Sequence, residues 1–139
     1  MTKGSRFGKW EEPIIEHGVP TKWNWVVLYP EKLTMGFGTD VGAFCLLNAK
    51  NHIYLGKHVQ IGSHSVINSI STVDGREGSV TIHDHAKIGS HCAVFPGVTI
   101  GEGAVVGAGA LVNKDIPTGA TVFGWPVNKC MVFGQKLGF

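Results

Sequence analysis

Aliphatic residues return at every sixth position along most of the chain. From Met35 onward, twelve six-residue segments (hexads) each begin with Leu, Ile, Val or Met, and the fifth position is usually small or β-branched. Two residues are skipped after His52, and nine residues interrupt the series at 73–81. This period excludes an amphipathic α-helix. It predicts short strands joined by tight corners, with positions one and five turned inward and glycine where the backbone bends.

The hexads, and above all VTIGEGAVVGAGALVNKDIP at 98–117, resemble the hexapeptide-repeat acyltransferase family, including its sugar and galactoside acetyltransferases. The resemblance implies an all-β, left-handed parallel β-helix in a single domain, with three hexads in each triangular coil. Coils should then begin at Met35, Leu55, Ile82 and Ile100. The expected organisation is an N-terminal cap at 1–34, a repeat domain at 35–120 with a loop excursion at 73–81, and a tail at 121–139.

The N-terminal segment carries three of the four tryptophans, and Trp23, Trp25 and Val27 alternate along it. We expect it to cover the open end of the β-helix, which would otherwise expose strand edges and core. Stacking of one tryptophan on a sugar is the alternative interpretation. The tail contains a Gly-x-Pro sequence at 124–126 that resembles the turn closing the family's coils.

Composition narrows the choice of partners and surroundings. The 139 residues are 43% hydrophobic and 16% charged, which excludes disorder, and the net charge of +2 gives no basic patch for nucleic acid. No apolar run is long enough to span a membrane, and the N-terminus has no signal-peptide core. The cysteines Cys45, Cys92 and Cys130 are widely spaced and odd in number. They predict reduced, buried thiols in a cytoplasmic protein.

The tetrapeptide IGSH occurs at 61–64 and again at 88–91. If 61 and 88 occupy the same corner of consecutive coils, His64 lies beside His91, and His58 lies beside His85 in the same way. A neutral imidazole can act as a general base that activates a hydroxyl or amine to attack a thioester. Corner histidines also arise from coil duplication alone, and for the 58/85 pair the two interpretations are equally good.

The family resemblance also shows where this chain departs from the pattern. Galactoside-type members carry a catalytic histidine where this chain has Thr72, and the excursion contains no histidine. Three hypotheses remain for the base. His64 ranks first and Asp74 second, and in the third no protein base is needed because the acceptor amine arrives neutral.

The resemblance further implies an acetyl-CoA site between neighbouring subunits of a homotrimer, with no metal. Residues at the corresponding positions are Ser90, Gly107, Ala108, Asn113, Lys114 and Lys129. The lysines would supply charge for the coenzyme phosphates. The residues expected to contact a sugar-type acceptor are Asp40, Asn48, Thr72 and His91.

Two other classes of protein compete with a CoA-dependent acetyltransferase. Gamma-class carbonic anhydrases use the same fold and hold zinc with three histidines, but their His-x4-His spacing is missing here, where paired histidines are six apart. A non-enzymatic trimeric scaffold is the other alternative. It would require neither the excursion nor Lys114.

Overall fold

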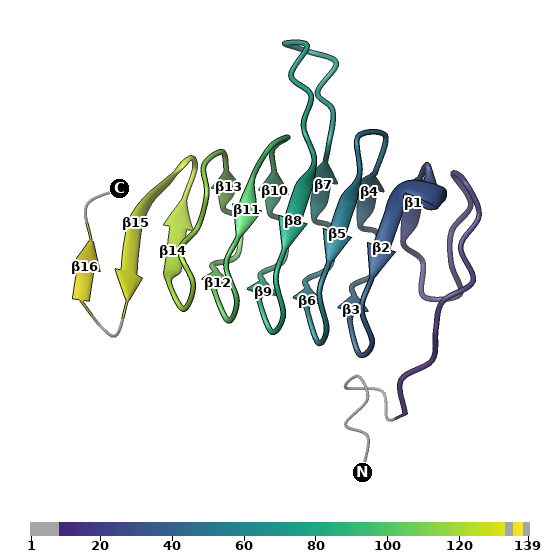
Figure 1. Cartoon of the computed structure of the whole chain (residues 1–139), viewed down its shortest axis with the longest axis horizontal. Helices are drawn as coiled ribbons and strands as arrows, with labels where there is room; N and C mark the ends of the chain where they lie inside the picture. The colour runs from purple at the N-terminus through teal and green to yellow at the C-terminus, as the bar shows by residue number, and fades with distance from the viewer. Residues whose placement is uncertain (1–8, 133–134, 138–139) are drawn as a thin grey trace.

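The computed structural model describes residues 9–132 and 135–137, and its strands form three ladders around a prism (Figure 1). Face 1 consists of β1 (Val26–Leu28), β4 (Leu46–Asn48), β7 (Val66–Asn68), β10 (Ala93–Val94) and β13 (Leu111–Val112). Face 2 consists of β2 (Leu33–Met35), β5 (Ile53–Leu55), β8 (Val80–Ile82) and β11 (Thr99–Ile100). Face 3 consists of β3 (Asp40–Val41), β6 (Gln60–Ile61), β9 (Lys87–Ile88), β12 (Val105–Val106) and β14 (Thr121–Gly124), and it ends in β15 (Val127–Val132) and β16 (Gln135–Leu137).

The predicted register is confirmed by the pairing of the strands. Met35 pairs with Leu55, Leu55 with Ile82, and Ile82 with Ile100, all in parallel. Ile61 pairs with Ile88, which places the two IGSH sequences at one corner of successive coils. The described residues contain no α-helix. The period of six therefore places each strand beside its predicted neighbour.

The core is a column of inward-facing aliphatic and small side chains. First-position residues such as Ile61 and Ile100 are buried, and so are fifth-position residues such as Ser65 and Ala104. Strands of two or three residues suffice because every coil pairs with the coils on both sides of it. Burial therefore follows the hexad pattern.

The fourth position of the hexads explains why histidine and glycine alternate there. His58, His64, His85 and His91 all have φ between 55° and 64°, in the left-handed region. Gly109, at the same position of a later coil, has φ 74°. Histidine is one of the non-glycine residues enriched in this conformation. The corner geometry thus accounts for the position of these histidines without a catalytic role.

The coils begin earlier than residue 35, the predicted start of the repeat domain. β1 pairs in parallel with β4, and β2 starts at Leu33, so part of the expected cap belongs to the prism. The corner between β1 and β2 is a short 3-10 helix, η1 (Pro30–Lys32), which hides the period of six. Trp25 is buried at this end of the core.

The excursion also differs from its predicted bounds. It spans 69–79 between β7 and β8, rather than 73–81, because Val80 and Thr81 already belong to β8. Ile70 and Glu77 bridge across its two arms in antiparallel fashion. The loop projects beyond the prism (Figure 1), and Val73 at its tip is 97% exposed.

The tail closes the C-terminal end of the prism as a hairpin. β14 continues the parallel ladder of face 3, and β15 folds back against it in antiparallel pairing. The turn between them contains a cis peptide bond at Trp125–Pro126. Residues 133–134 and 138–139 of the predicted tail lie outside the described residues.

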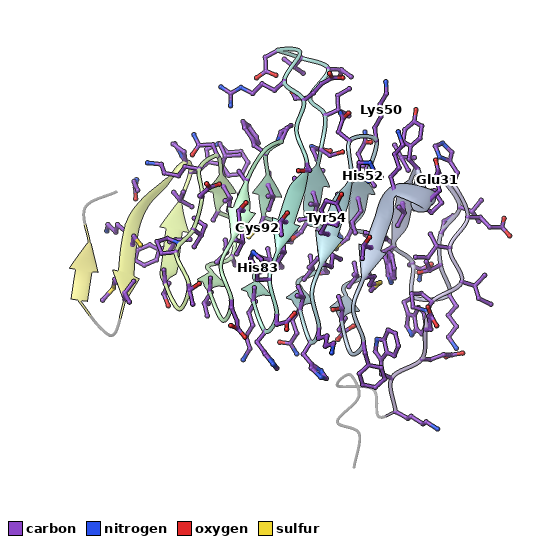
Figure 2. All side chains as sticks on the ribbon, in the orientation of Figure 1. Glu31, Lys50, His52, Tyr54, His83 and Cys92 are labelled. Carbon is purple, nitrogen blue, oxygen red and sulfur yellow. The ribbon has the colours of Figure 1, made fainter. Side chains whose placement is uncertain are left out.

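Cysteines at the fifth position occupy the core, as predicted. Cys45 and Cys92 are buried (Figure 2), and burial raises the pKa of both thiols. Their Sγ atoms contact the carbonyl oxygens of Gly62 and Gly107 at 3.1 and 3.2 Å. Raised pKa and burial both lower the fraction of accessible thiolate.

We therefore expect Cys45 and Cys92 to react slowly with Ellman's reagent at pH 8 in the native protein and rapidly in denaturant. The variant Cys130→Ala isolates these two thiols for the measurement. Native reaction at the rate seen in denaturant would contradict their burial.

Candidate functional site

Two columns of aromatic rings run along two edges of the prism. On the edge between faces 3 and 1 (the His64 edge), the rings of His64 and His91 are parallel within 1° and 4.9 Å apart, and Phe44 lies 5.2 Å from His64. On the edge between faces 2 and 3 (the His58 edge), the rings of His58 and His85 lie 5.3 Å apart. The predicted stacking of both pairs is confirmed.

The two columns border face 3, and the surface between them is hollowed. A shallow groove of about 220 Å³ crosses β6, β9 and β12. Gln60, Lys87 and Val105 are neighbours in register along it, and all three side chains are exposed. Face 3 therefore presents an elongated surface with one cation at its centre and imidazoles on both sides.

Three predicted coenzyme contacts lie on the His64 edge. Ser90 precedes His91, and Gly107 and Ala108 occupy the same corner one coil later. The N–H of Gly109 donates to the carbonyl of Ser90 at 2.9 Å, and the N–H of Gly107 donates to that of Val122 at 2.8 Å. These two N–H groups hold successive coils together, so they do not serve as oxyanion donors.

A second group of predicted residues lies on the edge between faces 1 and 2, which we call the loop edge. It carries Asn48, Thr72, Asp74, Asn113 and Lys114. Within one chain, β7 separates this group from the His64 edge, because His64 precedes that strand and the loop follows it. One chain therefore does not bring His64 and Asp74 together.

The remaining two predicted residues lie apart from both groups. Asp40 is 8% exposed on β3, at the N-terminal end of face 3, and lines a pocket with tryptophans of the cap. Lys129 lies on β15, with its Nζ 5.6 Å from the ring centre of Phe123. Neither residue faces the excursion.

Asp74 is held by its own loop. Its Oδ1 accepts a hydrogen bond from the N–H of Arg76 at 3.1 Å, and its Oδ2 lies 3.2 Å from that guanidinium. The backbone hydrogen bond, followed by one from Ser71, lowers the pKa of Asp74 below its ordinary value. A carboxylate with a lowered pKa is a weaker base, which favours a role for Asp74 in ordering the loop.

We expect the Asp74 carboxyl to titrate below its ordinary value of 3.8, followed by its carboxyl ¹³C shift in NMR. Since the folded pKa is depressed, the loop contacts of the ionised group persist above the ordinary value and are lost as pH falls through the folded value. Arg76→Ala should keep most of this shift, because the largest cause is a backbone N–H. A midpoint at or above the ordinary value would contradict the loop geometry.

Some constituents of this surface were missed in the sequence. Gln60 and Lys87 both stand at hexad position six, 27 residues apart, so the register itself marked them as neighbours. Phe44 shares position four with His64, which was a signal that its ring would extend the column. The groove itself had no sequence signal, because its depth depends on how corners from three coils protrude.

Two searches of the structure give negative results. In 9–132 and 135–137, no group of three His, Cys, Asp or Glu side chains is arranged to hold a metal ion. Over the same ranges, no helix has the length and apolar character needed to cross a bilayer.

The prism, its hexads and the bordered groove define the class of protein. Residues 78–114 match the family model described as bacterial transferase hexapeptide (six repeats). The chain belongs to the hexapeptide-repeat transferase family, as the resemblance predicted.

A curated relative is "Putative acetyltransferase YvoF" of Bacillus subtilis (strain 168), 38% identical over 101 residues. The match covers 73% of this chain and 48% of YvoF, so the chain spans about half the length of that relative.

Solved structures share the fold. The hexapeptide-repeat acetyltransferase VCA0836 of Vibrio cholerae, complexed with acetyl coenzyme A, aligns with a TM-score of 0.70 and 24% identity over 83% of this chain and 66% of that chain. A maltose O-acetyltransferase of Clostridium difficile 630 gives 0.67 and 24% over 83% and 63%. The N-acyltransferase AntD of Bacillus cereus, with dTDP-4-amino-4,6-dideoxyglucose and coenzyme A, gives 0.63 and 20% over 90% and 82%. These likenesses confirm the left-handed β-helix.

Proposed function

We propose that this protein transfers an acetyl group from acetyl-CoA to an amino or hydroxyl group of a sugar or nucleotide sugar. The observation that carries the proposal is the stacked pair His64–His91 beside a groove on face 3, within a hexapeptide-repeat fold. The names of structural neighbours support it, since they include an acetyltransferase bound to acetyl-CoA and acyltransferases of maltose and of an amino sugar nucleotide.

In the proposed reaction, His64 accepts the proton of the acceptor hydroxyl or amine as that group attacks the thioester carbonyl. The new C–O or C–N bond forms and gives a tetrahedral oxyanion. That intermediate collapses with cleavage of the C–S bond, and coenzyme A leaves as a thiol after taking up a proton. His91 packs on the ring of His64 and orients it. An acceptor amine that arrives neutral would reduce the need for His64.

The donor is proposed to lie along the His64 edge and the last coils. Small groups at Ser90, Gly107 and Ala108 leave room for the pantetheine arm close to the backbone. Asn113, Lys114 and Lys129 are assigned to the coenzyme, and the exposed Lys87 adds a cation for its phosphates. Asp40, Asn48, Thr72 and His91 stay the proposed acceptor contacts.

We infer that the site is completed in a closed homotrimer. A single chain carries its predicted residues on two separate edges, and a three-fold arrangement can set the His64 edge of one subunit against the loop edge of the next. The free, buried cysteines also fit a reducing cytoplasm as the place of action.

The test is a thiol-release assay with acetyl-CoA over a panel of amino sugars, nucleotide-linked amino sugars and galactosides. At least one acceptor should give saturable release of coenzyme A together with the acetylated product in mass spectra. Release with no acceptor dependence, or none with any member of the panel, would overturn the proposal.

The shared site has its own test. Two variants that are each inactive, His64→Asn and Lys114→Ala, should regain part of the activity when co-expressed, because mixed trimers contain intact pairs of edges. Failure to regain activity, or a stable monomer in light scattering at micromolar concentration, would overturn the shared site while leaving acetyl transfer open to the first assay.

A further inference from the structure

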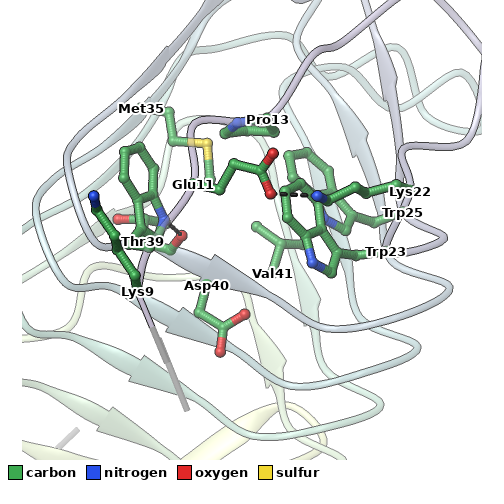
Figure 3. Close-up of a pocket in the computed structure, with 11 residues that line it drawn as sticks. Lys9, Glu11, Pro13, Lys22, Trp23, Trp25, Met35, Thr39, Asp40 and Val41 are labelled. Atoms are coloured by element: carbon green, nitrogen blue, oxygen red, sulfur yellow. Dashed lines mark hydrogen bonds and ion pairs between the residues drawn. The ribbon is translucent and has the colours of Figure 1, made fainter. Parts of the chain in front are cut away.

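The cap and the first coil enclose a pocket at the N-terminal end of face 3 (Figure 3). Its volume is about 250 Å³. Since liquid water occupies about 30 Å³ per molecule, this space equals about eight waters. It accommodates one small ring and excludes a nucleotide. Three tryptophans line it, Trp10, Trp23 and Trp25, together with Met35.

The aromatic walls are fixed before any ligand arrives. The indole N–H of Trp10 donates to the carbonyl of Thr39 at 2.8 Å, and the edge of its ring packs against Phe37 at 4.8 Å. Trp25 is 2% exposed. The ammonium of Lys22 lies 4.9 Å from the centre of the Trp23 ring. Preorganised walls of this kind reduce the entropic cost of binding a flat ligand.

Polar groups surround the walls with balanced charge. Lys22 forms an ion pair with Glu11 beside the tryptophans, and Lys9 and Asp40 complete the lining (Figure 3). Two lysines and two acidic residues leave no formal charge, so the pocket offers no preference for a phosphate or an isolated cation. Carboxylates accept hydrogen bonds from hydroxyl groups, and lysines donate to them.

We propose that this pocket binds a single neutral pyranose ring. The C–H face of a pyranose is apolar and flat, matching indole surfaces, while its equatorial hydroxyls point outward to polar groups such as Asp40 and Lys9. β3, which carries Asp40, pairs directly with β6, which lines the groove. The pocket therefore lies at the end of the groove, in position to hold a sugar unit that adjoins the acetylated one. Binding itself needs neither coenzyme nor transfer.

The experiment is a titration of intrinsic tryptophan fluorescence with methyl β-glucopyranoside and methyl β-galactopyranoside, without acetyl-CoA. At least one glycoside should give a saturable change with Kd of about 1–10 mM, the affinity expected for a ligand of this size. Tetramethylammonium chloride, matched in concentration, tests the alternative that the tryptophans form a cage for cations. Glycerol controls for a change of solvent.

Matched variants locate the binding. Trp10→Leu should weaken it about tenfold, and Trp10→Phe, which keeps an aromatic wall, by about threefold or less. Trp125→Leu should change nothing, because that side chain is 64% exposed on the hairpin at the other end of the prism. Circular dichroism and melting curves verify that each variant folds. If Trp10→Leu fails to fold, saturation-transfer NMR on the wild type, with its signal reduced by unlabelled competitor, takes its place.

The proposal is overturned by the absence of saturation with either glycoside, by tighter binding of tetramethylammonium, or by equal losses in the Trp10 and Trp125 variants. A negative thiol-release assay with positive titrations would remove the proposed acetyl transfer and leave this pocket standing. The reverse outcome would remove the pocket alone.

Discussion

Replacing His64 with asparagine is expected to lower kcat of acetyl transfer by about a hundredfold or more, the usual contribution of a positioned general base. The fold and acetyl-CoA binding should be retained. Asparagine is preferable to alanine at this position because the backbone of His64 has φ 61°, which asparagine tolerates and alanine does not. Steady-state kinetics with the best acceptor and calorimetric binding of acetyl-CoA provide the measurement.

His91 and His52 supply the comparisons. His91→Asn should cause a smaller loss, because His91 only packs on the ring of His64. His52→Asn should leave kcat near the wild-type value, since His52 shares the left-handed backbone, with φ 73°, but packs on Tyr54 on the outside of β5. Near-wild-type turnover in the His64 and His91 variants alike would mean that the repeated IGSH is architectural, and that the acceptor needs no base.

Replacing Gly89 with alanine is expected to lower the free energy of unfolding by about 3 kcal/mol, within the range for overpacked sites. A Cβ at Gly89 would lie 2.5 Å from the backbone nitrogen of Ala108 and 2.7 Å from its Cα, in the next coil. Those atoms belong to backbone and cannot rotate away, so the coils would have to separate. Chemical denaturation followed by circular dichroism, at one fixed protein concentration, measures the change.

Gly109 gives the matched control on the same edge. A Cβ there meets nothing within 4 Å, but the residue has φ 74°. Gly109→Ala should therefore cost only about 1 kcal/mol, from the left-handed backbone alone. A larger loss at Gly109 than at Gly89 would show that backbone conformation, rather than the closeness of coils, limits this fold.

The period of six was enough to predict the fold because one property, the inward turn of two positions, recurs at every coil. It set the pairing of Ile61 with Ile88 and the stacking of His64 on His91 before any coordinates. Where the period breaks, prediction failed. The η1 corner hid the first coil, and the pairing of Ile70 with Glu77 moved the bounds of the loop.

The candidate site was less accessible to sequence reasoning. Hexad register assigns a residue to a corner, but the resemblance placed His64 and Asp74 in one site, whereas a single chain sets them at opposite ends of β7. The return of Trp10 to contact Thr39 joins residues 29 apart, outside any repeat, so nothing in the pattern indicated a tryptophan pocket.

The parallel ladders also bear on how the chain reaches its native state. Ladder partners such as Ile82 and Ile100 are only 18 residues apart, so the loop closed by each new coil is short for an all-β protein. Assembly can spread from one coil to its neighbour, as in other repeat arrays. The step from Ile61 to Ile88 spans 27 residues, because the excursion lies within it. Closing that longer loop carries the greatest entropic penalty among the parallel coil-to-coil steps, which makes β6–β9 the natural boundary between two halves of the folding reaction.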